Sequence, residues 1–182
     1  MKKIKVLIMA VLVMMTSLAV RAQKEMTFEQ MLPVRVLMPI NNEIKGDALT
    51  VLYNRLNQAV TLNGLGSSTN EERFLIVTSV TVLSKDATAS VPVQYMAEVE
   101  VAVYFVDNYK KIILSQEMIT KKGLDGTEDK AVAKAIKQIQ ARDPKLKKLI
   151  KVGKERAIQY YSTVEELEKS DGDPDVSWVF EQ

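Results

Sequence analysis

The stretch VQYMAEVEVAVYFVD, residues 93–107, decides the fold, because apolar side chains recur at every second position along it. Successive side chains of a β-strand point to opposite faces, so this alternation predicts a strand. One face would carry Ala97, Val99, Val101, Val103 and Phe105. The other would carry Met96, Glu98, Glu100, Ala102 and Tyr104. We therefore expect one packed face and one face that meets water at its start.

Further strands are expected on both sides of this stretch. RFLIVTSVTVL, residues 73–83, is apolar on both faces, which is typical of a central strand. SKDATASVP, residues 84–92, is expected to be a loop. After the turn DNYKK, residues 107–111, the stretch IILSQEMIT, residues 112–120, returns as a strand. Consecutive strands connected in this way favour an antiparallel meander.

The residues before the meander predict one strand and one helix. VRVLMPI, residues 34–40, is β-branched and apolar, with Pro39 near its end. Asp47 can cap a helix that Asn63-Gly64 and Gly66 would stop. Its apolar positions fall at helical spacing: Leu49, Leu52, Leu56 and Val60.

Two helices are expected after the meander. TEDKAVAKAIKQIQAR, residues 127–142, has an apolar face with lysines outside. The next helix would begin with Asp143 as cap and Pro144 in the first position. The order β-α-β-β-β-α-α predicts an α+β fold, in which helices pack on a mostly antiparallel four-stranded sheet.

A Gly-x-x-Gly turn, Gly123 to Gly126, lies ahead of the first of these helices. A phosphate loop would need the pattern Gly-x-x-x-x-Gly-Lys-Ser/Thr, which is missing, and nearby carboxylates would repel a phosphate. Asp125 can instead cap the helix, with Glu128 reaching back to complete a capping box. We interpret this motif as a structural joint between strand and helix.

The chain divides into three parts by composition. Residues 1–22 have basic residues, an apolar run and a small residue before Gln23, as expected of a cleaved signal peptide. The run from Val6 to Val20 is shorter than the roughly 20 residues that a membrane-spanning helix needs. Residues 23–162 would form one domain, and residues 163–182 an acidic C-terminal tail that ends in an apolar segment. We expect no transmembrane segment after cleavage.

The sequence contains no cysteine and no histidine. Without cysteine there is no lipoprotein anchor, disulfide or thiolate metal site. Without histidine, Ser-His and Cys-His catalysis are excluded, and a zinc hydrolase is disfavoured. We expect a periplasmic or secreted protein of Gram-negative type that is not lipidated, uses no cofactor and binds no nucleic acid.

The C-terminal tail carries two further signals. Asp171, Asp173 and Asp175 have the spacing of the first ligands of a calcium loop, but the later ligand positions do not match. The apolar segment VSWVF, residues 176–180, could dock on its own domain, extend a sheet edge or bind a partner. We expect it to dock, with the acidic residues near the lysine-rich helices.

A family resemblance rests on short motifs over residues 34–162. They are NGLG at Asn63–Gly66, Arg73-Phe74, the pair Gly123 and Gly126, and Gly153-Lys154 with Tyr160-Tyr161. With them, the chain resembles an uncharacterised family of exported Gram-negative envelope proteins. The element order is also similar to the periplasmic domains of the curli-secretion lipoprotein and of the lipoprotein activators of penicillin-binding proteins. That resemblance implies assembly or regulation and transfers no catalytic residue; the lipidated cysteine of those relatives is missing here.

These observations favour a non-enzymatic binding or assembly component of the cell envelope that acts through protein–protein contacts, as a homo-oligomer or with another envelope protein. Contacts are expected at a sheet edge, at residues 64–72 or at the tail. The individual candidates are Asn63, Gly64, Gly66, Arg73, Trp178 and Phe180. One alternative is a small-molecule or polysaccharide-binding protein with a pocket between helices and sheet. Another is a hydrolase that uses carboxylates alone.

Overall fold

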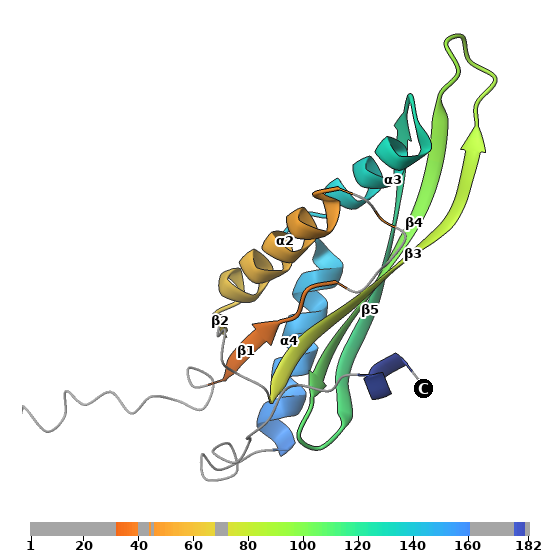
Figure 1. The fold of residues 1–182 in the computed structure, drawn as a ribbon. Coiled ribbons are helices and arrows are strands. Elements are labelled where there is room, and N and C mark those ends of the chain that lie inside the picture. Colours follow the sequence, from red (N-terminus) through yellow and green to blue (C-terminus); the bar gives the residue numbers. More distant parts are fainter. Residues whose placement is uncertain (1–31, 40–43, 45, 68–72, 161–176, 181–182) are drawn as a thin grey trace, which may run out of the picture.

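The computed structural model describes residues 32–39, 44, 46–67, 73–160 and 177–180. Within them, a five-stranded sheet in the order β2-β1-β3-β4-β5 carries helices on one face, and a short C-terminal helical turn lies on the other face (Figure 1). The predicted signal peptide and most of the acidic tail lie outside the described residues. In the described part, none of the helices is both long and apolar enough to cross a membrane.

The predicted order of elements is confirmed, with a two-residue strand and a C-terminal 3₁₀ turn in addition. The elements are β1 (Pro33–Val36), α2 (Ala48–Leu62), β2 (Gly66–Ser67), β3 (Phe74–Ala87), β4 (Tyr95–Asp107), β5 (Ile112–Asp125), α3 (Glu128–Lys137), α4 (Pro144–Tyr160) and η3 (Ser177–Phe180). Strands β3, β4 and β5 form the expected antiparallel meander. The sheet as a whole is mixed, because β1 runs parallel to both β2 and β3. A strand that returns through a helical crossover arrives parallel to the first, as β3 does after α2.

The meander is longer than its apolar pattern predicts. β3 continues to Ala87, so the first part of the expected loop at residues 84–92 is strand. A register shift between Val82 and Ser84 lets the pairing with β4 continue. β5 also runs on to Asp125 and takes in most of the expected Gly-x-x-Gly turn. In each case, pairing with β4 holds the segment as a strand, although its local composition does not favour one.

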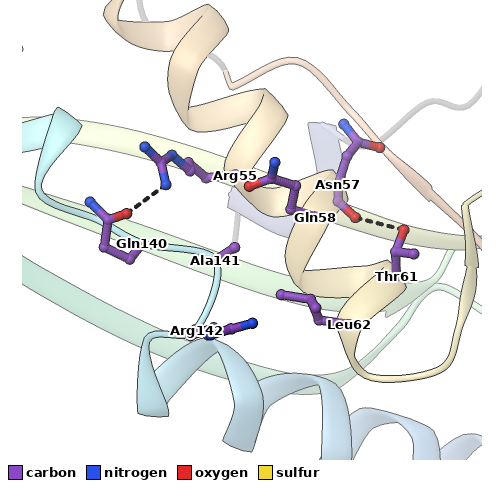
Figure 2. Close-up of a pocket in the computed structure, with 8 residues that line it drawn as sticks. All are labelled: Arg55, Asn57, Gln58, Thr61, Leu62, Gln140, Ala141 and Arg142. Carbon is purple, nitrogen blue, oxygen red and sulfur yellow. Dashed lines mark hydrogen bonds between the residues drawn. The ribbon is translucent and has the colours of Figure 1, made fainter.

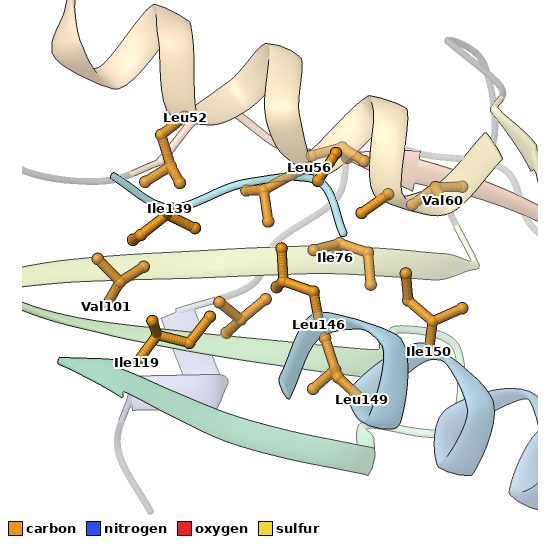
Figure 3. Packing of buried hydrophobic residues seen from close by; sticks show 14 of the residues in the cluster. Leu52, Leu56, Val60, Ile76, Val101, Ile119, Ile139, Leu146, Leu149 and Ile150 are labelled. Atoms are coloured by element: carbon orange, nitrogen blue, oxygen red, sulfur yellow. The ribbon is translucent and has the colours of Figure 1, made fainter. Parts of the chain in front are cut away.

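The core lies between the helices and the inner face of the sheet (Figure 3). The alternation predicted for β4 is confirmed, since its five expected inward residues are all buried. Large aliphatic side chains meet them from the other elements: Leu52, Leu56 and Val60 of α2, Ile76 of β3, Ile119 of β5, Ile139, and Leu146, Leu149 and Ile150 of α4. Full burial of such a side chain is worth about 1.5–3 kcal/mol, so this layer is the main source of stability.

A glycine allows α4 to lie close to the sheet. A Cβ atom at Gly153 would be 2.8 Å from Cε1 of Phe105, and Phe105 itself packs edge-on against Phe74 with ring centroids 6.4 Å apart. Interiors are packed too densely for such an atom to be absorbed without movement. Gly153 thus sets the distance between α4 and β4.

The two predicted helix caps differ in outcome. Asp143 does cap α4, because its Oδ1 accepts a hydrogen bond from the backbone N–H of Lys145 at 3.0 Å. Asp47 precedes α2, but its side chain makes no cap hydrogen bond. Its carboxylate accepts instead from Lys137 Nζ at 2.9 Å, and this bond lowers the pKa of Asp47 from its ordinary value of 3.8. The expectation that Asp47 caps the helix by its side chain is wrong.

Candidate functional site

The two glycines of the Gly-x-x-Gly motif have different environments. Gly123 lies in β5 against α3, and a Cβ there would collide with the carbonyl oxygen of Ala131 and come 2.6 Å from the backbone nitrogen of Ala135. Nothing lies within 4 Å of the equivalent position at Gly126. The first glycine therefore permits a close backbone approach, while the second occupies the short connection before α3.

The cap of α3 is Thr127, not Asp125. The Thr127 side chain accepts a hydrogen bond from the backbone N–H of Lys130. Lys130 is three residues after the cap, the position where a capping box would need glutamate or glutamine. Asp125 accepts from its neighbour Gly126 and pairs with Lys134 at 3.7 Å. Glu128 lies 3.9 Å from Lys85 on β3. The predicted capping box is wrong because β5 does not turn at Gly123 but continues as a strand to Asp125. The helix therefore starts later, with Thr127 at its cap.

The NGLG motif closes α2 and starts a strand. Asn63 donates from its side chain to the carbonyl of Ala59 at 2.7 Å, and Gly64 takes the positive φ of 75° that ends the helix. Gly66 pairs with Pro33 in the short β2–β1 ladder. The structure thus gives Asn63, Gly64 and Gly66 local structural contacts, and residues 68–72 of the expected contact loop lie outside the described residues.

Arg73, also expected at a contact surface, is only 1% exposed. Its Nε lies 3.4 Å from Oδ2 of Asp107, a residue with no exposed surface, and its guanidinium stacks near the rings of Phe74 and Tyr109. Asp107 Oδ1 accepts from the backbone N–H groups of Tyr109 and Lys110. The pair fixes the β4–β5 turn to the start of β3, so this arginine is an internal support.

The apolar tail segment lies on the outer face of the sheet, opposite the helices (Figure 1). Val179 is buried in a second apolar cluster, with Leu75 and Val77 of β3 and Val106 of β4. Trp178 donates from Nε1 to Oδ1 of Asn108 at 3.2 Å. Phe180 packs edge-on against Tyr104 with centroids 5.9 Å apart. Three destinations were considered for this segment, and in the structure it docks on the chain's own sheet.

This docking differs from the expected one in its position. The lysine-rich helices α3 and α4 cover the inner face of the sheet, whereas η3 covers the outer face. The acidic residues at 165–175 lie outside the described residues, so their expected proximity to the helix lysines stays a prediction. Asp171, Asp173 and Asp175 fall in the same range.

The sequence predicted two strands joined by a loop here, but not that they extend into a projecting β3–β4 hairpin arm, which we define as residues 83–96. Strand pairing ends at Ala87 and Tyr95, so residues 88–94 project past the end of β5 and past α3 (Figure 1). Large apolar side chains are exposed along the arm and at the end of the neighbouring β5: Leu83, Val91, Val93, Met96 and Leu124. Met96 and Leu124 are partners in the β4–β5 ladder. Exposed apolar side chains therefore occur at several places along the arm and beside its base.

The β5 edge of the sheet is covered by side-chain donors from the two helices that follow it. Arg156 donates to the carbonyl of Leu114, and Lys145 donates to that of Met118. Farther along, the carbonyls of Lys122 and Leu124 accept from Gln138 and Lys134. An uncovered edge strand invites pairing with another chain, and these contacts oppose it. They also give Lys134, Lys145 and Arg156 a structural role.

A hollow of about 820 Å³ lies between α2 and the connection from α3 to α4. Figure 2 shows side chains from both sides of it. The lining residues are Arg55, Asn57, Gln58, Thr61, Leu62, Gln140, Ala141 and Arg142. This hollow is in the helix layer, not between helices and sheet as the alternative hypothesis expected.

A second hollow, of about 570 Å³, does lie between a helix and the sheet, along α4 and β5. Its polar groups already bind one another. Lys148 pairs with Glu117 at 2.6 Å, and the Ser115 hydroxyl donates to the carbonyl of Leu149 at 2.7 Å. A ligand would have to displace these contacts, so this hollow is better described as the seam that joins α4 to β5.

No protein-family model matches the chain, and no curated protein matches it. Solved structures that it resembles include a minor lipoprotein from Acinetobacter baumannii, at 13% identity over 58% of this chain and 84% of that one, with a TM-score of 0.39. Protein XCC0632 from Xanthomonas campestris matches at 13% identity over 72% and 89%, with a TM-score of 0.46. A PelC dodecamer from Paraburkholderia phytofirmans matches at 15% over 61% and 88%, with a TM-score of 0.36.

These matches come from Gram-negative bacteria, and one of them is a lipoprotein by name. At such identities and TM-scores they carry no conclusion about activity or site residues. The narrower resemblance to the curli-secretion lipoprotein and to the activators of penicillin-binding proteins stays a prediction.

Proposed function

We propose that this protein is a non-enzymatic component of the cell envelope that binds another protein through the β3–β4 hairpin arm. The observation that carries this proposal is the set of apolar side chains that the arm leaves in solvent, above all Val91, which is 98% exposed. Single exposed apolar residues are ordinary on protein surfaces, but several of them on one projecting hairpin favour a contact site.

The arm is held in shape before any partner arrives. The backbone N–H of Thr88 donates to the carbonyl of Gln94 at 2.7 Å, and the Thr88 hydroxyl lies 2.6 Å from that of Ser90. Ser90 in turn donates to the carbonyl of Pro92. Binding by a pre-formed loop costs less conformational entropy than binding by a segment that must first fold. These hydrogen bonds therefore support a role in recognition.

The location and the class of protein rest on the sequence. A leader-like segment at residues 1–22 supports export, and the absence of histidine and cysteine disfavours common nucleophile-base and thiolate chemistry. We place the protein in the periplasm or outside the cell, without a lipid anchor. The similarity of element order to domains that assist secretion and wall synthesis supports a role in assembly, with either another envelope protein or a second copy as partner.

The test is site-specific photo-cross-linking in intact cells that export the full chain. A photoreactive residue at Val91 or Val93 is expected to give one discrete higher-mass species. The same residue at Lys151, on the outer side of α4, serves as the control and should give none. Mass spectrometry of the product distinguishes another envelope protein from a second copy. Only monomer at both arm positions would overturn the proposal.

A further inference from the structure

We propose that the hollow between α2 and the α3–α4 connection binds a small soluble organic anion through Arg55 and Arg142. This site is separate from the hairpin arm in position and chemistry. It concerns a ligand that the protein would carry or sense, whatever partner the arm contacts.

Among the residues that the structure describes, the hollow is lined by two arginines and by no carboxylate. Its eight lining residues include Arg55 and Arg142 but neither aspartate nor glutamate. Elsewhere in the described part of the chain, basic side chains are commonly paired with acids. The ion pairs are Lys134–Asp125, Lys137–Asp47, Lys148–Glu117 and Lys151–Glu155. Among the described residues, no carboxylate lines this hollow to balance its positive charge, which favours an anionic ligand.

The two arginines are in different states. Arg55 donates from Nη1 to Oε1 of Gln140 at 2.5 Å, a contact between α2 and the α3–α4 connection that orients its guanidinium (Figure 2). Within the described residues, Arg142 makes no hydrogen bond or ion pair. Its exposed side chain can therefore donate two hydrogen bonds to an oxyanion without breaking a contact to another described residue.

The other lining residues indicate what else the ligand would carry. Gln58 offers a donor and an acceptor suited to hydroxyl groups. Thr61 and Gln140 already donate to the carbonyls of Asn57 and Lys137, so they offer mainly their oxygens as acceptors. Leu62 and Ala141 supply an apolar part. The volume of about 820 Å³ falls within the range of about 300–1,000 Å³ typical of small-molecule sites. A hydroxylated molecule with a carboxylate or phosphate group, such as a sugar acid or sugar phosphate, matches this set.

Isothermal titration calorimetry of the full mature chain tests the proposal with three probes: glucuronate, glucose 6-phosphate and vesicles of anionic phospholipid. We expect saturable binding of at least one soluble probe. Arg142→Gln should weaken it by about tenfold or more, because a charge-assisted bidentate contact is lost, and the double variant with Arg55→Gln should abolish it. The matched control Lys130→Gln removes the same charge from the far end of α3 and should leave affinity unchanged.

Three results would overturn the proposal. They are no binding of either soluble probe at millimolar concentration, undiminished binding by the double variant, and binding of the vesicles alone. Because Arg142 is exposed and makes no hydrogen bond or ion pair to another described residue, Arg142→Gln is expected to melt like the wild type. That result would separate a lost ligand contact from a lost fold. Failure of this test would leave the cross-linking result at the arm unaffected, since neither variant alters the arm.

Discussion

The two faces of the sheet are covered in different ways. On the inner face, three helices bury side chains along the length of the meander, and the fit is so close that glycine is required at Gly123 and Gly153. On the outer face, the described residues cover the end formed by Leu75, Val77 and Val106, with the four-residue turn η3. Farther along, this face carries the exposed Met118 and the ion pair Glu98–Lys122 before it reaches the arm.

This difference separates residues that hold the fold from residues that are free to meet a partner. Changes on the inner face should cost the most stability, changes under the tail less, and changes at the arm almost none. The predictions below test that order, from the largest expected loss of stability to the smallest.

The largest loss is expected for Gly123→Ala. Its new Cβ would collide with backbone atoms of α3, so the helix must move away from β5, at a cost of about 3 kcal/mol or more. The matched control is Gly126→Ala in the same motif, where nothing lies within 4 Å. Urea unfolding followed by circular dichroism measures both. Equal losses in the two variants would show that the motif acts as a simple turn.

An intermediate loss is expected when the tail is removed. Deletion of residues 170–182 exposes the apolar cluster under Val179 and removes the Trp178–Asn108 hydrogen bond. We expect a loss of about 2–4 kcal/mol, which is a fall of roughly 4–16 °C in melting temperature for a chain of this size. Scanning calorimetry makes the comparison. An unchanged melting midpoint would mean that the tail does not cover the outer face in solution.

A small, pH-dependent change is expected at Asp47. Its pKa is lowered chiefly by the hydrogen bond from Lys137, so the stabilisation exists above the ordinary value of 3.8 and is lost as pH falls through the folded-state pKa. Asp47→Asn should melt slightly lower than the wild type at neutral pH, and the two should converge below about pH 3.8. Asp86→Asn, on the exposed part of β3, is the control. A difference that persists at low pH would contradict this assignment.

Local patterns predicted the element order because they are strongest where burial is most regular. The alternation in β4 and the two apolar faces of β3 predicted an antiparallel meander, and Asp143-Pro144 predicted the start of α4; the structure confirms each. Mixed strand direction was not predicted, since the partner of a four-residue strand depends on contacts distant in sequence.

The candidate sites were less predictable because they depend on which distant segments meet. The polar run at residues 84–87 gives no strand signal, yet it pairs with β4 and lengthens the arm. Arg55 and Gln140 are 85 residues apart, so no spacing could have joined them. Arg73 can be buried because Asp107, on another strand, supplies its counter-charge. Conversely, the apolar end of an acidic tail predicted a docking segment correctly from composition alone.

The arm gives the most direct test of the central claim, that its exposed apolar side chains serve binding and not folding. The double variant Val91→Asp with Val93→Asp should keep the wild-type melting temperature, because neither side chain is buried. Photo-cross-linking from a probe at Met96 should then fall by about tenfold or more, since charged side chains oppose an apolar contact. Wild-type cross-linking by a variant that melts normally would contradict the account.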